Sequence, residues 1–396
     1  MALAATTLTE RRAPHQALDR LGLLVALVAL AGLLTPFAAF RANRIVPGTA
    51  IALWAALPGW ETVLTGAVLV GAAALAVVRL SPAARLLVGF AALLVLAIAI
   101  GDAARFLTPA GDHLSRTSPG TGFWLLALAF SLLLSDAVAR LGLTPLGRLS
   151  ILAAVVGTVA LILESGLWGD LSVLREYANR ADSFWREGAA HVGLALGSLA
   201  AATLIGVPLG IVCHRVAAVR ATLLNLLNGI QTIPSIALFG LLIAPLAWIA
   251  AVVPGAAALG ISGIGTAPAM LALILYALLP VVANTVAGLA GVPEATEEAA
   301  RGMGMTDMQR LLQVEFPLAL PVILTGIRIV LVQNIGLATV AALIGGGGFG
   351  VFVFQGVGQT AMDLVLLGAI PTVAMAFAAA IVLDALVELA TPGGRA

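Results

Sequence analysis

Apolar stretches long enough to cross a membrane recur along the whole 396-residue chain, and this feature restricts the fold more than any other. A helix needs about 20 mostly apolar residues to cross the hydrocarbon core of a bilayer. We place such stretches at residues 21–40, 61–79, 86–101, 122–140, 149–168, 190–213, 221–247, 266–290, 320–343 and 363–388. The sequence therefore predicts an all-α integral membrane protein with about ten transmembrane helices.

Composition agrees with this prediction. Hydrophobic residues make up 61% of the chain and charged residues only 10%, whereas a soluble domain has about 25% charged residues. The excess apolar surface must face lipid, because a soluble fold of this length cannot bury it. The net charge of +1 gives no indication of a nucleic-acid partner, and we predict none. The single cysteine, Cys213, excludes an internal disulfide and a cysteine cluster, and we predict no metal site.

The positions of the arginines predict the orientation. Most arginines outside the expected spans fall in segments on the same side as the N-terminus, including Arg11 and Arg12 before the first span and Arg301 and Arg310 before the ninth. Cytoplasmic loops carry such an excess of positive charge, so we expect both termini in the cytoplasm. The run at 21–40 exceeds the apolar core of a signal peptide, about 7–15 residues, and is predicted to be a retained first helix.

The segment at residues 170–188 divides the chain into two halves. It is predicted to form an amphipathic helix on the outer surface, with Leu174, Tyr177, Phe184 and Trp185 on its apolar side. It serves either as a docking surface for an external partner or as a connector lying on the membrane. We predict an accessory helical domain at 1–169, this outer connector at 170–188, and a functional core at 189–390, where the motifs concentrate.

A charged loop at residues 294–321 interrupts the apolar core. Acidic residues begin a first helix, which Gly302 and Gly304 break, and Thr306 with Asp307 is expected to cap a second helix, Met308–Val314. Pro317 is expected to end that second helix. The sequence predicts a helix–turn–helix on the cytoplasmic surface, with a shape that fits a groove on a partner protein.

The loop resembles the EAA loop of ABC importer permeases, in which Glu-Ala-Ala, a glycine and an Ile-x-Leu-Pro group recur at fixed spacing. Here Val and Phe replace the usual Ile and Leu. By this resemblance the residues that couple to an ATPase are Glu298, Ala299, Ala300, Gly304, Val314, Phe316 and Pro317.

Further motifs narrow the resemblance to the permeases for glycine betaine, carnitine, choline and proline, the osmoprotectant uptake group. It covers residues 189–390, and the preceding spans are similar to those of a long form of this group. The motifs lie at His191, Ser198, 206–210, 231–235, 276–280, 284–285, 326–328, 338–339, 345–350 and 368–371.

The resemblance implies a methionine-permease-like type I importer core formed by the last five spans, in a bacterial inner membrane. It also implies a second permease copy or a paralogue, a cytoplasmic ABC ATPase and a periplasmic or extracytoplasmic solute-binding protein. All basic residues besides histidine are arginine, and a Walker-type phosphate loop requires a lysine. We therefore expect no catalytic residue and no cofactor in this chain, with ATP bound by the partner.

Polar residues within the expected spans are candidates for the translocation pathway, because such residues face a cavity or another helix rather than lipid. Each could instead form only an interhelical hydrogen bond. The candidates are Gln231, Thr232, Pro234, Ser235, Asn284, Gln333 and Asn334. The glycine run at 345–350 is expected to be either a flexible outer gate or a tight re-entrant turn.

Two alternative functions stay open: a permease of the same fold for another small solute, and an ion-coupled secondary transporter. A secondary transporter usually buries ionisable residues at mid-membrane. Asp136, Arg328, Asp384 and Glu388 instead lie towards helix ends in the expected topology. A quaternary ammonium is normally bound in an aromatic cage, and only 5% of this chain is aromatic, so we expect tight recognition to belong to the binding protein.

Overall fold

The computed structural model describes residues 18–43, 46–109, 111–112 and 114–390. The predicted cytoplasmic ends of the chain, including Arg11 and Arg12, lie outside these ranges. Within them, nine helices are long and apolar enough to cross a membrane, and the shorter apolar helix α1 precedes them. The predicted helical membrane fold is confirmed. The nine are Gly59–Val77, Pro82–Leu107, Thr121–Leu141, Pro145–Glu164, Ala181–Arg215, Ser235–Val252, Thr266–Ala290, Asp307–Ala338 and Met362–Leu389.

The chain divides into two units. The first contains the residues up to Leu143 together with Ile162–Leu171, and the second contains Thr144–Leu161 together with the residues from Ser172 onwards. Helix α6 (Pro145–Glu164) therefore contributes most of its length to the second unit.

Five helices and a small sheet form the first unit: α1 (Arg20–Leu34), α2 (Leu53–Ala56), α3 (Gly59–Val77), α4 (Pro82–Leu107), α5 (Thr121–Leu141) and the strands β1 (Ala38–Arg41), β2 (Thr49–Ile51) and β3 (Arg116–Pro119). α2 is a single turn, and the other four are the long helices. Small residues allow close packing between them: a Cβ added at Gly32 would lie 2.8 Å from the side chain of Leu126. The strands pair antiparallel in the order β2-β1-β3, with Ala39 opposite Ala50 and Ser118.

The first predicted span, 21–40, is wrong at its C-terminal end, since α1 stops at Leu34 and residues 38–41 form β1. Proline disfavours helical backbone at the residue before it, and Pro36 follows Thr35, whose φ of −104° and ψ of 162° are extended. The sequence does not predict the sheet, because the apolar residues of β1 look like a continuation of the span, and β2 and β3 are only three and four residues long.

Buried charges join three helices of the first unit. Arg85 of α4 is 1% exposed and lies 2.7 Å from Asp19 and 3.2 Å from Asp136 of α5. Arg140 pairs with Asp136 at 2.8 Å, as its position one turn later predicts, and with Asp19 at 3.0 Å. Asp19 also accepts a hydrogen bond from the backbone N–H of Gly22 and thereby caps α1. Burial acts to raise the pKa of Asp19, but the hydrogen bond from Gly22 and the charges of Arg85 and Arg140 outweigh it and leave that pKa below its usual value.

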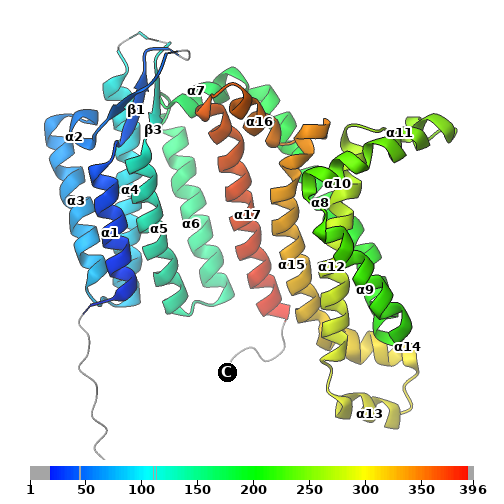
Figure 1. The fold of residues 1–396 in the computed structure, drawn as a ribbon. Coiled ribbons are helices and arrows are strands. Elements are labelled where there is room, and N and C mark those ends of the chain that lie inside the picture. The colour runs from blue at the N-terminus through cyan, green and yellow to red at the C-terminus, as the bar shows by residue number, and fades with distance from the viewer. Residues whose placement is uncertain (1–17, 44–45, 110, 113, 391–396) are drawn as a thin grey trace, which may run out of the picture. The chain divides into compact units, whose positions relative to one another are not determined.

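The second unit is helical. Besides α6 it contains α7 (Ser172–Asn179), α8 (Ala181–Arg215), α9 (Ala217–Thr232), α10 (Ser235–Leu241), α11 (Ile243–Val252), η1 (Ala257–Leu259), α12 (Thr266–Ala290), α13 (Glu294–Gly302), α14 (Asp307–Arg310), η2 (Leu311–Glu315), α15 (Phe316–Ala338), η3 (Val340–Ile344), α16 (Gly350–Gly358) and α17 (Met362–Ala390). Helix α12 is the most buried span and packs against α8, α9 and α15. Within this unit, α13 and α14 lie at one end of the helices and α7 and α16 at the other (Figure 1).

Two predicted elements of the second unit are wrong in detail. The span at 221–247 is interrupted, because Ile233 precedes Pro234 and is extended, with φ −70° and ψ 127°. The segment at 170–188 is not one helix, since α7 ends at Asn179 and α8 begins at Ala181. Tyr177 and Phe184 pack against Phe349 and Phe352 in an aromatic cluster.

Candidate coupling hairpin and pathway pocket

Helices α13 and α14 form the expected helix–turn–helix, which joins the C-terminal end of α12 to α15. Gly304 forms the turn with a φ of +79°, a conformation that L side chains rarely adopt. Thr306 caps α14 in a capping box with Gln309, and this confirms the predicted cap. We name residues 294–315 the hairpin.

The expectation that Pro317 ends the second helix is wrong. A π-turn at Leu311–Glu315 carries α14 directly into α15, where Pro317 occupies the first turn. Proline has no N–H, and its ring would clash with the carbonyl of Gln313 in a regular helix. The wider π-turn accommodates both effects and lets the chain continue as one helix from Asp307 to Ala338.

The motif residues have different exposures on the hairpin. Glu298 and Ala299 are exposed on α13, Gly304 is exposed at the tip, and Pro317 is exposed on α15. Ala300 is 1% exposed. Val314 and Phe316 are half-buried, and Phe316 packs beside Leu289 and Ile323.

The tip of the hairpin also carries two exposed methionines, Met303 (72% exposed) and Met308 (62% exposed). Methionine side chains adapt to a partner surface. The hairpin therefore presents apolar groups and the Glu298 carboxylate on a surface suited to a protein partner.

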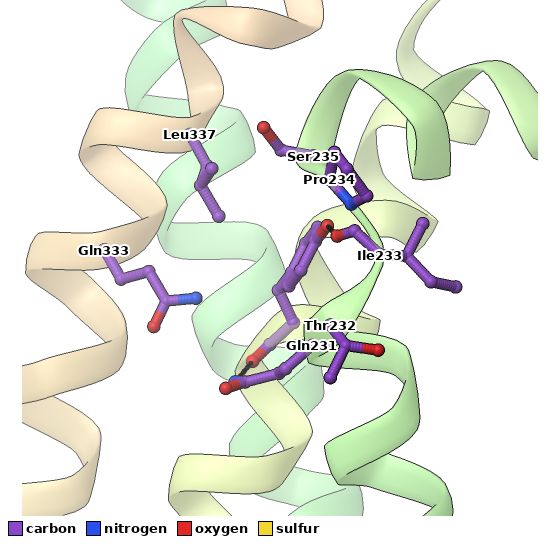
Figure 2. Close-up of a pocket in the computed structure, with 8 residues that line it drawn as sticks. Gln231, Thr232, Ile233, Pro234, Ser235, Gln333 and Leu337 are labelled. Atoms are coloured by element: carbon purple, nitrogen blue, oxygen red, sulfur yellow. Dashed lines mark hydrogen bonds between the residues drawn. The ribbon is translucent and has the colours of Figure 1, made fainter.

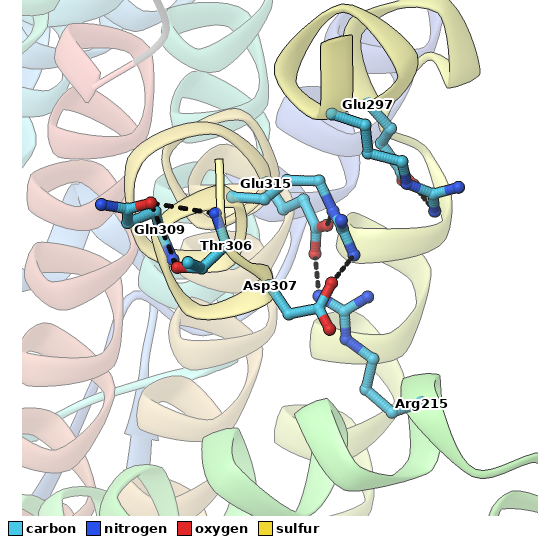
Figure 3. Close-up of polar contacts among 8 residues, drawn as sticks. Arg215, Glu297, Thr306, Asp307, Gln309 and Glu315 are labelled. Atoms are coloured by element: carbon cyan, nitrogen blue, oxygen red, sulfur yellow. Dashed lines mark hydrogen bonds and ion pairs between the residues drawn. The ribbon is translucent and has the colours of Figure 1, made fainter. Parts of the chain in front are cut away.

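A buried ionic contact fixes the hairpin to α8 (Figure 3). Glu315 is 1% exposed, and its carboxylate lies 2.6 Å from Arg215 at the C-terminal end of α8 and 2.7 Å from Arg310. Arg310, itself 6% exposed, also contacts Asp307 at 2.9 Å. Sequence reasoning missed this group. A single sequence gives no signal that Arg215 and Glu315 meet, because a hundred residues separate them.

A pocket of about 300 Å³ lies where α9 breaks, beside α15 (Figure 2). The Gln231 side-chain amide donates to the carbonyl of Tyr276 at 2.9 Å, and the Tyr276 hydroxyl donates to the carbonyl of Ile233 at 2.5 Å. These bonds fix the interruption between α9 and α10. Of the candidate pathway residues, the pocket brings together Gln231, Thr232, Pro234, Ser235 and Gln333.

The other two candidates lie outside this pocket. Asn334 is fully buried, and its side-chain amide donates to the hydroxyl of Ser198 on α8 at 2.7 Å. Asn284 donates to the carbonyl of Pro280 in its own helix at 2.8 Å and packs against Gly326. Both make local or interhelical contacts in this structure.

The glycine run forms a tight turn fixed to α8. Gly345, Gly347 and Gly348 have positive φ. The backbone N–H of Gly348 donates to the Glu187 carboxylate at 2.9 Å. His191, fully buried, accepts from the N–H of Phe349 through Nδ1 at 3.2 Å and contacts the carbonyl of Ile335 through Nε2 at 2.9 Å. We name residues 345–349 the glycine turn.

Two ion pairs join spans of the second unit. Arg328 of α15 pairs with Asp384 of α17, and Arg148 of α6 pairs with Glu388 one turn further along α17. These pairs neutralise their charges within the helical unit. Such groups serve to join helices and do not form a chain of free acids for an ion relay.

Two family models match the chain. Residues 19–174 match the N-terminal domain of the ABC transporter permease YehY, and residues 202–395 match the binding-protein-dependent transport system inner membrane component.

Curated relatives match one half of the chain over most of their own length. The osmoprotectant import permease protein OsmW of Salmonella typhimurium is 40% identical over 204 residues, which are 52% of this chain and 90% of OsmW. The choline transport system permease protein OpuBB of Bacillus subtilis is 35% identical, over 52% of this chain and 87% of OpuBB. The carnitine transport permease protein OpuCB of Listeria monocytogenes is 36% identical, over 51% of this chain and 85% of OpuCB.

Among solved structures, the inward-facing methionine ABC transporter MetNI is similar over 53% of this chain and 95% of its own, with 22% identity and a TM-score of 0.46.

Proposed function

Because this chain belongs to the ABC importer permease family that includes osmoprotectant, choline and carnitine permeases, we propose that it carries a quaternary ammonium osmoprotectant or proline into the cell. Family membership makes it a multi-pass inner-membrane transport subunit. Glycine betaine, choline and carnitine are the proposed substrates besides proline, and the printed functions of the relatives support this choice.

The hairpin couples the permease to a separate ATPase, which binds the ATP. The observation that carries this proposal is the hairpin geometry, since the family pattern lies on an exposed, capped turn between two spans. Glu298 and Ala299 are free to contact a partner, while Ala300 and Phe316 pack inward. The groups that touch the ATPase and the groups that support the hairpin therefore lie on different faces.

Two substitutions test this assignment. Glu298→Arg reverses an exposed charge, and Gly304→Trp adds bulk at a tip where no atom lies within 4 Å of an added Cβ. Both should abolish ATP-driven uptake while the protein still inserts into the membrane. Normal uptake by both variants would remove the coupling role from the hairpin.

The partners and the orientation complete the proposal. A second permease copy or a paralogue completes the pathway, an extracytoplasmic binding protein delivers the solute, and both termini lie in the cytoplasm. In a variant that replaces Cys213, which is buried, Asp307→Cys should react with an impermeant thiol reagent only from the cytoplasmic side. Reaction from the outer side alone would invert the topology.

The pocket at the α9–α10 break forms part of the pathway, and it binds solute weakly. Its lining offers amide, hydroxyl and apolar groups, with Tyr276 as its aromatic member and no charged side chain. An aromatic cage requires several rings around the cation. The complex of permease and ATPase without the binding protein should therefore show no tight betaine binding in calorimetry, and micromolar binding would contradict the assignment.

The N-terminal residues 1–169 are proposed to be an accessory domain joined through residues 170–188 to the core at 189–390. The separate family matches at residues 19–174 and 202–395 support a division of the chain in this region.

A further inference from the structure

We propose that Glu315 and Arg215 form a positioning joint through which movement of the hairpin is passed to α8, and that α8 passes it to the glycine turn. The inference rests on the proposed coupling role of the hairpin. It assigns a role to Arg215 and Glu315, which are not among the coupling residues that the family resemblance gives, and connects them to the glycine turn near the other end of α8.

The joint is a buried carboxylate between two guanidinium groups. Glu315 is 1% exposed, and Arg215 and Arg310 lie at 2.6 and 2.7 Å. Charge-assisted hydrogen bonds of this length are strong and directional. A buried carboxylate is costly without its partners, so the joint resists opening when the hairpin is pushed. Arg215 lies in the last turn of α8, where a positive charge is also favoured by the helix dipole.

The position of Glu315 makes the joint specific to the hairpin. It is the last residue of the π-turn that connects α14 to α15. Arg310, which shares its carboxylate, belongs to α14 and contacts Asp307 at the start of that helix. Any displacement of α14 therefore acts on the Glu315 carboxylate and through it on Arg215.

Helix α8 reaches from the joint to the other end of the unit. It has 35 residues, a length of about 52 Å at 1.5 Å per residue. Near its start, Glu187 and His191 hold the backbone of Gly348 and Phe349. Midway, Ser198 is hydrogen-bonded to Asn334 of α15. Helices α8 and α15 are thus connected at the joint and midway, and α8 is connected to the glycine turn near its start.

A proline inside α8, between its middle and the joint, does not break this connection. Pro208 lies between Gly206 and Gly210, both of which pack closely on α12. A Cβ added at Gly206 would lie 2.8 Å from Val281, and one at Gly210 would lie 2.5 Å from Thr285. Packing at this distance leaves the segment around Pro208 little room to bend independently.

The test uses the full complex of permease, ATPase and binding protein in proteoliposomes, with radiolabelled glycine betaine and choline as solutes. The variants are Glu315→Gln, Arg215→Gln and Arg215→Lys. The matched control is Glu388→Gln, which removes one carboxylate from another interhelical pair, that with Arg148. Arg215 is 34% exposed at a helix end, so its substitution should leave the protein folded.

Two quantities are measured: solute transported per ATP hydrolysed, and the reactivity of Leu343→Cys with an impermeant reagent. Leu343 is 47% exposed and lies in η3, two residues before the glycine turn. In the parent protein its reactivity should differ between the nucleotide-free and vanadate-trapped states. If the contact between Arg215 and Glu315 were only structural, breaking it would leave this difference in reactivity unchanged.

Glu315→Gln and Arg215→Gln should still bind the ATPase and hydrolyse ATP, but transport per ATP should fall at least about fivefold, the lower end of typical coupling between sites. Leu343→Cys should then react equally in both nucleotide states. Arg215→Lys should restore most of the coupling, because the contact to Glu315 is made by one nitrogen. Glu388→Gln should behave like the parent.

Three results would contradict the proposed joint. They are a parent-like transport per ATP in Arg215→Gln, a loss of ATPase binding in that variant, and an equal loss of transport per ATP in Glu388→Gln. A different result would contradict the proposed function, namely the absence of ATP-driven uptake by the parent complex.

Discussion

Gln333 and Asn334 are neighbours in sequence, and the structure predicts opposite effects when each is replaced. Gln333 lines the pocket, whereas Asn334 is fully buried and donates to Ser198 across the α8–α15 interface. Replacing Asn334 should lower stability and leave solute handling unchanged. Replacing Gln333 should change solute handling and leave stability unchanged.

The size of the Asn334 effect follows from the contact. An interhelical hydrogen bond in a membrane protein contributes about 0.6 kcal/mol on average and at most about 1.7 kcal/mol. Asn334→Leu keeps a side chain of similar size, so cavity formation adds little. The Ser198 hydroxyl still donates to the carbonyl of Leu194 at 2.6 Å and is not left without an acceptor. At about 2–4 °C per kcal/mol, Tm should fall by about 1–7 °C.

The assay pairs thermal unfolding in detergent, followed by tryptophan fluorescence, with the KM for uptake in proteoliposomes. A double-mutant cycle with Ser198→Ala should give a coupling free energy of about 0.6–1.7 kcal/mol. Gln333→Ala should raise the uptake KM with an unchanged Tm. The reasoning fails if Asn334→Leu changes the KM at an unchanged Tm, or if the cycle gives no coupling.

Three further predictions concern other regions. Arg85→Met leaves only the more exposed Arg140 to pair with Asp19 and Asp136. It should destabilise the first unit by at most about 3–5 kcal/mol, measured as a fall in Tm; an unchanged Tm would contradict this. The pKa of Asp19 is lower in the folded protein than its unfolded value of 3.8, so its ionisation stabilises the fold. This contribution is complete above pH 3.8 and is lost as the pH falls through the lower folded pKa. Asp19→Asn should therefore flatten the decline of Tm below about pH 4, and an unchanged dependence of Tm on pH would refute the contribution. Gly304→Ala forces an L residue into positive φ at a cost of about 1–2 kcal/mol and should lower the amount of solute transported per ATP. Gly302→Ala, in open space at the end of α13, should leave that ratio unchanged. Equal effects of the two substitutions would show that the positive φ of Gly304 is not the cause.

The long spans could be predicted because apolar composition over about 20 residues has few alternatives to a membrane helix. The ends of the helices are harder to predict, and the prolines show the reason. The residues before Pro36 and Pro234 are extended and end their helices, yet Pro208 and Pro280 lie inside continuous helices. The preference of the preceding residue is the same in all four cases. Tertiary packing decides between the two outcomes, and a single sequence does not show that packing.

The candidate site likewise has some features that the sequence predicts and others that it does not. The turn at Gly304 and the cap at Thr306 follow from local backbone chemistry and were predictable. The contact of Glu315 with Arg215 depends on two helices meeting far apart in sequence, and no local pattern indicates it. Asn334 carried a correct signal, a polar residue too costly to expose to lipid, but that signal does not distinguish a pocket from a helix interface.

We propose that ATP hydrolysis by a separate subunit, acting through the hairpin, drives uptake. The most direct measurement is uptake of radiolabelled glycine betaine and choline by proteoliposomes containing the permease, its ATPase and its binding protein, with ATP or an ion gradient as the only energy source. Uptake should require ATP, ignore the gradient and be lost in Glu298→Arg. Gradient-driven uptake by the permease alone, unaffected by Glu298→Arg, would contradict the claim.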